Sequence, residues 1–181
     1  MLADAMRAIG FATLVTDGLT ANPLPMLLQD GVLRGHVARA NPVWQAGDGA
    51  ALAVFLGPHA YISPSWYPSK AETGKAVPTW NYIVVQARGR IRWIQDGEWL
   101  RAHVSALSDA HEQARSEPWQ ISDAPAGYID ALVRGIVGFE LAIESLDGKY
   151  KLSQNRDARD RDGVRDGLMR DGHDDLAKVI P

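Results

Sequence analysis

Two Asp-Gly pairs near the N-terminus constrain the fold more than any other sequence feature. Three runs, at 11–16, 24–28 and 32–37, are rich in strand-forming residues. Asp17-Gly18 follows the first run, and Asp30-Gly31 lies between the second and the third. Such a pair between two apolar runs is a strong hairpin signal, because Asp and Gly tolerate the positive φ angles of tight turns. Strands connected by turns this short must be antiparallel neighbours. The pattern therefore favours a meander over alternating βαβ units.

The rest of the chain alternates predicted strands with short helices. Leu2, Met6 and Ile9 recur at helical spacing, and Asn41-Pro42 has the pattern of an N-cap followed by a first helical residue. Asp147-Gly148 predicts a turn before residues 149–155. Further helices are expected at 99–107, from 109, at 128–133 and at 164–169, and further strands at 50–56, 82–94 and 136–143. We expect one α+β, mostly β domain over 1–181, with peripheral helices and a charged helical tail from about 156.

Several classes of protein are excluded by what the sequence lacks. The chain has no cysteine, which removes disulfides, thiolate catalysis, zinc ribbons and iron–sulfur clusters. The five histidines show no metal-binding spacing, and no glycine-rich dinucleotide or phosphate loop occurs, so no metal site is expected. No apolar run approaches the ~20 residues that cross a bilayer. The N-terminus has no signal-peptide pattern, and a cytoplasmic location without membrane contact is expected.

The charge balance argues against a dedicated DNA-binding domain. The net charge is −3, and the most basic-looking segment, 147–171, balances seven Lys/Arg with six Asp. Proteins that bind DNA directly draw much of their affinity from neutralising phosphates. Arg88, Arg90 and Arg92 alternate along one predicted strand and would share a face, as a basic patch or a solvated strand face. Direct DNA binding is therefore not expected.

Three polar, aromatic segments are candidates for a binding site. Gly35–Pro42 combines a strand end, an arginine and a helix start. This combination suits the binding of a phosphate group; alternatively, the segment only connects a strand to a helix. Residues 57–67 and 77–82 offer hydroxyls, an amide and aromatic faces. These suit a planar heterocycle with polar edges, or alternatively form aromatic core beneath loops. The first of them begins a stretch, 57–78, with four prolines, which predicts a long ordered loop.

Five short blocks resemble those of one known family. The blocks, which follow one another between residues 35 and 156, are GHVARANPVW, GPHAYISPSWY, VPTWNY, IVGFE and GKYKLSQNR, and the resemblance covers roughly residues 10–165. They resemble the signature blocks of the PaiB-type FMN-binding negative transcriptional regulators. That resemblance implies a split β-barrel related to pyridoxine-phosphate oxidases, a homodimer, and FMN held between the subunits.

The resemblance also implies which residues bind the cofactor. At the phosphate end of the flavin it places His36, Arg39 and Asn41. Along the ribityl chain or the ring it places Ser63, Ser65, Trp66 and Tyr67. From the partner subunit, the residues expected to reach the same site are Thr79, Trp80, Asn81, Gln154 and Asn155. No catalytic residue is assigned.

The chain differs from the family pattern at two places, and two other functions are alternatives to the regulator role. Family members carry a longer segment before the first helix, and a His where this chain has Asn22-Pro23. The missing His predicts either altered reactivity of FMN or weak binding of it. A regulator or sensor role competes with a flavin-dependent oxidoreductase that takes a hydride from NADH or NADPH. A haem-handling split barrel would need an axial ligand, for which His59 is the candidate.

Overall fold

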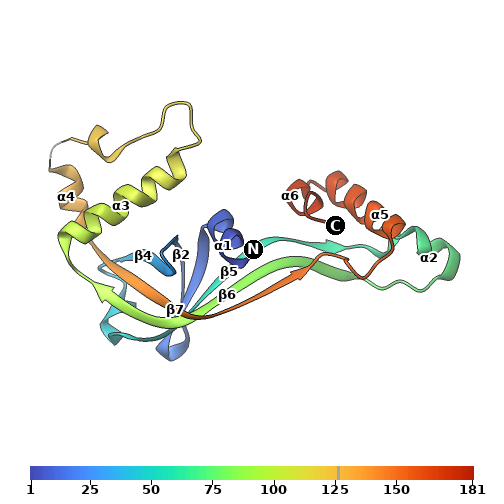
Figure 1. The fold of residues 1–181 in the computed structure, drawn as a ribbon, viewed down its shortest axis with the longest axis horizontal. Coiled ribbons are helices and arrows are strands. Elements are labelled where there is room, and N and C mark those ends of the chain that lie inside the picture. The colour runs from blue at the N-terminus through green and yellow to red at the C-terminus, as the bar shows by residue number, and fades with distance from the viewer. Residues whose placement is uncertain (126) are drawn as a thin grey trace. The chain divides into compact units, whose positions relative to one another are not determined.

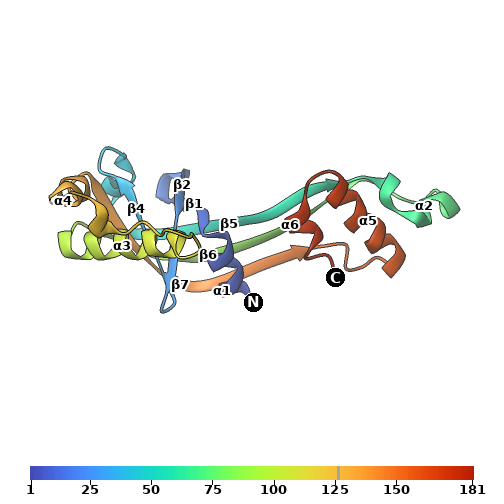
Figure 2. The ribbon, with the colours of Figure 1, turned by 90° about the horizontal axis from the view of Figure 1, so that it is seen from above.

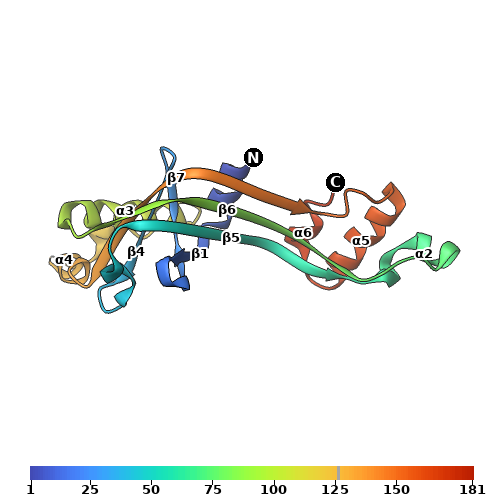
Figure 3. The same cartoon turned by 90° about the horizontal axis from the view of Figure 1, so that it is seen from below.

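The structure is a computed structural model that describes residues 1–125 and 127–181. Its single sheet has seven strands in the order β2-β1-β5-β6-β7-β4-β3. The chain divides into two compact units, residues 1–55 with 86–146 and residues 56–85 with 147–181. Three strands run through both units: β5 (Gly49–Ile62), β6 (Thr79–Ile94) and β7 (Ile136–Lys151), which Figure 3 shows side by side. The mostly β architecture with peripheral helices is confirmed.

The first unit is built on the predicted hairpins. It contains α1 (Leu2–Ile9), β1 (Phe11–Thr16), η1 (Asp17–Leu19), β2 (Thr20–Pro25), β3 (Leu27–Gln29) and β4 (Val32–Ala38). Strand β1 pairs antiparallel with β2 and β5, and β4 pairs antiparallel with β3 and β7. Asp30 and Gly31 join β3 to β4 with φ angles of 49° and 78°, as the turn signal predicts. The strand expected at 24–28 is instead divided between β2 and β3.

Three further helices of the first unit lie in the stretch of chain between β6 and β7. They are α3 (Gly97–Glu112), η4 (Ile121–Asp123) and α4 (Tyr128–Val133), and Figure 1 shows α3 and α4 side by side. The prediction of a separate helix from residue 109 was wrong. Asp96 caps α3 by accepting a hydrogen bond from the Trp99 N–H at 2.7 Å, and the helix continues through 109 without a break. A further short helix, η2 (Pro42–Ala46), follows Asn41 as predicted.

The second unit packs two C-terminal helices on one face of its strands. It contains η3 (Pro64–Trp66), α2 (Pro68–Thr73), α5 (Ala158–Arg170) and α6 (Asp174–Ala177), the last two in red in Figure 2. Its core joins side chains of the strands to side chains of α5 and α6. These include Ala60, Ile62, Ile83, Leu152, Val164, Leu168 and Leu176. Among the described helices, none is both long and apolar enough to cross a membrane.

Two local predictions failed because strand pairing overrides the local signal. The expected loop at 57–78 begins as strand, since β5 continues through Pro58 to Ile62. β1 pairs with β5 only along residues 51–54. Pro58 lies beyond this paired part, so the N–H that proline lacks is not needed for a hydrogen bond to β1. The turn expected at Asp147-Gly148 is absent, because β7 passes through both residues without interruption.

Gly89 lies where two backbones of the first unit come unusually close. A Cβ atom at this position would stand 1.8 Å from the carbonyl oxygen of Ala142 on β7. No side chain fits at that distance, since the neighbouring atom belongs to a backbone. The strand therefore requires glycine here.

Candidate functional site

Asn41 organises the connection between β4 and η2. Its side-chain oxygen accepts a hydrogen bond from the Val43 N–H at 3.0 Å, and its amide nitrogen donates to Asn22 Oδ1 at 2.7 Å. In the described part of the chain, the amide nitrogen of Asn22 is buried without a hydrogen-bond partner. Asn22 thus contacts a predicted cofactor residue and keeps one buried donor unpaired in the described residues.

Arg39 holds the two ends of the segment that contains α3 and α4. Its guanidinium donates to the carbonyl oxygens of Arg134 at 2.8 Å and Ile136 at 3.0 Å, and to Gln95 Oε1 at 2.7 Å. A phosphate at this position would share these nitrogens with three protein acceptors. Binding of phosphate by Arg39 stays a prediction.

His36 forms a pair with a histidine that the sequence did not suggest as a partner. His36 Nδ1 lies 3.1 Å from Nε2 of His103 on α3, and the ring of Trp99 stacks on His103 with centroids 5.2 Å apart. His103 is only 4% exposed, so this contact lies in the interior of the first unit. Burial, with smaller contributions from the charges of His36 and Arg34, lowers the pKa of His103 to about 4. Burial also lowers the pKa of His36.

The lowered pKa of His103 predicts a loss of stability in acid. The unfolded chain takes up a proton near pH 6.5, whereas the folded chain does so only near pH 4. The stabilisation is therefore complete above about pH 6.5, and falls by about 3 kcal/mol as the pH drops to 4. Urea unfolding at pH 7 and pH 4.5 should show this loss in the natural chain and a smaller one in His103→Leu. The control His111→Leu, an exposed position on the same helix, should keep the full loss; an equal loss in all three would contradict the assignment.

A small cationic pocket in the second unit gathers several predicted residues. Its volume is about 170 Å³, well below the size of a pocket for a whole cofactor. Four residues of the predicted site line it: Tyr67, Thr79, Asn81 and Asn155. It is also lined by Lys151, Ser153 and Arg156, which the sequence analysis did not single out, and by Val77 and Pro78. The missed residues belong to the GKYKLSQNR block, and the cations of that block, Lys149, Lys151 and Arg156, were the available signal.

The polar groups of this pocket are arranged by short contacts within the unit. Lys151 Nζ donates to the hydroxyl of Thr79, and the Asn81 amide donates to Ser153 Oγ at 2.9 Å. The Arg156 guanidinium lies 4.4 Å from the centre of the Tyr67 ring, a cation–π contact. Two cations, two hydroxyls and an amide at one small cavity have the chemistry of a phosphate site.

Other predicted residues of the second unit serve its own turns and packing. Ser63 Oγ accepts from the Ser65 N–H at 3.2 Å, and Gln154 bonds to the backbone of its own turn. Trp66 lies against α5, where a Cβ at Gly167 would come within 2.2 Å of its ring. Their contact with a cofactor stays a prediction.

An aromatic face lies opposite the helices of the second unit. His59 and Tyr61 on β5 are exposed, and Trp80 on β6 is 53% exposed. The Trp80 ring lies 6.4 Å from that of His59 and 6.2 Å from that of Tyr61, centre to centre. We call these three residues the aromatic face. Their neighbours Ala60 and Ile62 point the other way, into the core under α5 and α6.

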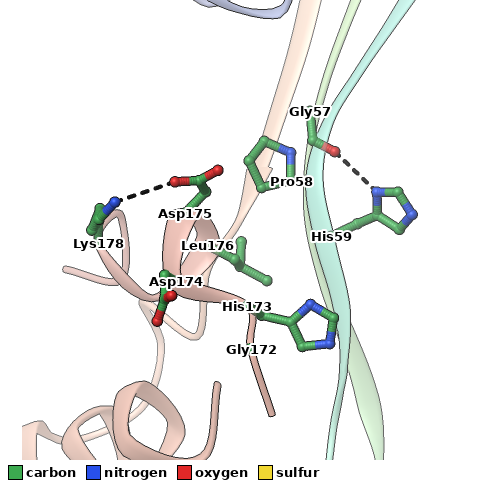
Figure 4. A pocket seen from close by; sticks show the side chains of 9 residues that line it. All are labelled: Gly57, Pro58, His59, Gly172, His173, Asp174, Asp175, Leu176 and Lys178. Carbon is green, nitrogen blue, oxygen red and sulfur yellow. Dashed lines mark hydrogen bonds and ion pairs between the residues drawn. The ribbon is translucent and has the colours of Figure 1, made fainter. Parts of the chain in front are cut away.

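A polar cavity of the second unit is shown in Figure 4 and has a volume of about 460 Å³. His59 and His173 lie on it with Asp174, Asp175 and Lys178. His59 Nδ1 bonds to the Gly57 carbonyl at 3.0 Å, and Lys178 pairs with Asp175 at 3.3 Å. In the described residues, no three His, Asp or Glu side chains come close enough to hold a metal ion.

Comparison with known proteins shows one family. A family model described as "Putative FMN-binding domain" matches residues 1–145. An uncharacterized protein of Emericella nidulans is 39% identical over 175 residues, covering 81% of this chain and 70% of the relative. Protease synthase and sporulation protein PAI 2 of Bacillus subtilis is 33% identical over 141 residues, covering 77% of this chain and 65% of that protein. The cationic pocket draws Lys151, Ser153 and Arg156 from beyond the matched range.

The fold is also found among solved structures. The FAD and heme binding protein from Mycobacterium smegmatis superimposes with a TM-score of 0.63, at 18% identity, over 94% of this chain and 76% of that chain. At this identity the likeness concerns the fold. It confirms the predicted split β-barrel.

Proposed function

This chain belongs to the family of FMN-binding split-barrel proteins, with FMN as its cofactor, and we propose that it acts as a homodimeric regulator or sensor. The observation that carries this proposal is the cationic pocket, which lies in the same unit as the aromatic face. The pocket offers the donors that a phosphate needs, and the aromatic face offers a surface for a flat ring. A regulator needs only to bind the flavin and to present it to a partner.

In this proposal Lys151 and Arg156 hold the FMN phosphate. Thr79 and Ser153 add hydroxyl donors, and their present bonds to Lys151 and Asn81 keep them oriented. Arg39 and Asn41 are the alternative phosphate ligands, and Ser63, Ser65 and Trp66 the candidates along the ribityl chain. Bound FMN would supply the capacity to accept or give one or two electrons. The protein groups bind and orient it, and none of them is assigned a catalytic step.

The experiment that separates a regulator from an enzyme is an anaerobic titration. The purified protein should show the absorbance bands of bound flavin. Addition of NADH or NADPH should then bleach these bands no faster than it bleaches free FMN. Rapid bleaching with turnover on readmission of oxygen would instead support the alternative, a flavin-dependent oxidoreductase.

A homodimer is proposed because the rings of the aromatic face, Tyr61 and Trp80 above all, are exposed. Sedimentation velocity should show a dimer, and Trp80→Asp should raise its dissociation constant by about 30-fold, since a buried Trp commonly contributes ~2 kcal/mol or more to an interface. Tyr128→Asp, at an equally exposed aromatic residue of the first unit, is the matched control and should have no effect. A natural chain that sediments as a monomer while carrying one FMN would contradict the proposal.

Regulation through direct DNA contact is not part of the proposal. Arg88, Arg90 and Arg92 do lie exposed on one face of β6, as predicted. However, Arg92 pairs with Glu140 at 2.9 Å and Arg88 donates to Gln86. The basic character of the strip is thus partly neutralised, so an effect on transcription would run through a protein partner or through the flavin.

A further inference from the structure

A second pocket, in the first unit, has an apolar lining and a histidine. Its volume is about 440 Å³, within the range of small-molecule sites. Apart from His36 and the hydroxyl of Ser108, its lining side chains are apolar or aromatic. They come from α3, from α4 and from the segment between them: Val104, Trp119, Ile121, Ile129, Leu132, Val133 and Ile136. We call this cavity the His36 pocket.

The His36–His103 pair fixes what the His36 pocket offers to a ligand. His103 Nδ1 is buried and has no hydrogen-bond partner in the described residues. A buried N–H without an acceptor is costlier than a bare lone pair, so the proton of His103 belongs on Nε2, where it is donated to His36 Nδ1. His36 then carries its own proton on Nε2. Within residues 1–125 and 127–181, no hydrogen bond reaches that atom.

We propose that the His36 pocket binds an uncharged aromatic molecule that bears a carbonyl oxygen, with His36 Nε2–H as the donor to that oxygen. The apolar walls and the ring of Trp119 suit a flat hydrocarbon body. A single N–H donor at the wall selects molecules with an acceptor, and no Lys, Arg, Asp or Glu lines the cavity to compensate a charged ligand. His103 acts as a positioning residue, since it sets the tautomer of His36 without touching the ligand.

Three probes of similar shape test this assignment on the full-length, FMN-loaded protein. 2-Acetylnaphthalene carries the ketone, 2-ethylnaphthalene lacks the acceptor, and 2-naphthoate carries a charge. Calorimetric titration should show the ketone binding about tenfold more tightly than the hydrocarbon, the ratio expected when one buried donor is otherwise left unsatisfied. The naphthoate should bind more weakly than both. Equal affinities for the three probes would overturn the proposal.

Two variants locate the binding and its hydrogen bond. His36→Phe keeps a ring at the pocket wall, so the hydrocarbon should still bind while the preference for the ketone disappears. Val104→Trp fills the cavity from α3 and should abolish binding of both; the same substitution at Val179, an exposed residue of the second unit, is its control. Ketone binding that survives Val104→Trp would place the ligand elsewhere.

The tautomer is measured independently of any variant. The ¹⁵N shifts of the His36 ring in the natural chain should report a protonated Nε2, and a protonated Nδ1 would overturn the assignment of the donor. Displacement of FMN by the ketone would also overturn the proposal, because His36 would then belong to the flavin site, as the family resemblance implies. Retention of FMN in the ketone complex is the expected result.

Discussion

Replacing both cations of the small pocket, in Lys151→Ala/Arg156→Ala, is expected to weaken FMN binding by about 100-fold while leaving riboflavin binding almost unchanged. Each charged hydrogen bond contributes ~1.5–3 kcal/mol, and neighbouring contributions are not fully additive. Riboflavin lacks the phosphate, so it reports any general damage to the site. Quenching of flavin fluorescence on titration of the apoprotein measures both affinities.

Two further variants make this result decisive. Arg159→Ala/Lys178→Ala removes the same charge from exposed residues whose partners, Glu72 and Asp175, lie outside the pocket, and should leave both affinities unchanged. Arg39→Ala tests the alternative phosphate position. A selective loss of FMN in Arg39→Ala, with none in the double variant of the pocket, would move the phosphate to the connection between β4 and η2.

Gly89→Ala is expected to lower the free energy of unfolding by about 3 kcal/mol or to prevent folding. The added methyl group would stand 1.8 Å from the Ala142 carbonyl oxygen, so β6 and β7 must separate locally. Overpacking typically costs ~1–3 kcal/mol, and a clash with backbone lies at the upper end because no rotamer relieves it. Urea unfolding followed by tryptophan fluorescence measures the change.

The control for this prediction is another glycine of the same unit. Gly97 opens α3, and a methyl group added there would have no neighbour within 4 Å; its φ angle is not positive either. Gly97→Ala should therefore be neutral or slightly stabilising. If the two variants unfold at the same urea concentration, the close approach at Gly89 is not a constraint on the fold.

The fold could be predicted where short-range chemistry dictates it. The Asp30-Gly31 turn and the Asn41 cap follow from the φ preference and the side-chain oxygen of those residues. The continuation of β5 through Pro58 could not be predicted, since it depends on where the neighbouring strand β1 ends. Asp147-Gly148 carries a local turn signal that the pairing of a long strand overrides.

In the candidate site, too, the sequence predicted some residues and missed those that depend on contacts distant in the chain. Tyr67, Thr79, Asn81 and Asn155 were predicted from their blocks and do line one pocket. Lys151 and Arg156 were overlooked because Gln154 and Asn155 between them look more like ligands, whereas Gln154 bonds to its own turn. The contact between His36 and His103 joins residues 67 positions apart, and no local pattern announces such a pair.

The bonds of Arg39 have a consequence for how this family can vary. One guanidinium fastens Gln95 on one side and Arg134 and Ile136 on the other, so the segment between them leaves and rejoins the sheet at a single point. Lengthening a connection whose ends are already fixed costs little chain entropy. The length of the segment between these anchors can therefore change at little cost, while Arg39 holds its two ends together and the pairing of β6 with β7 keeps the strands in place.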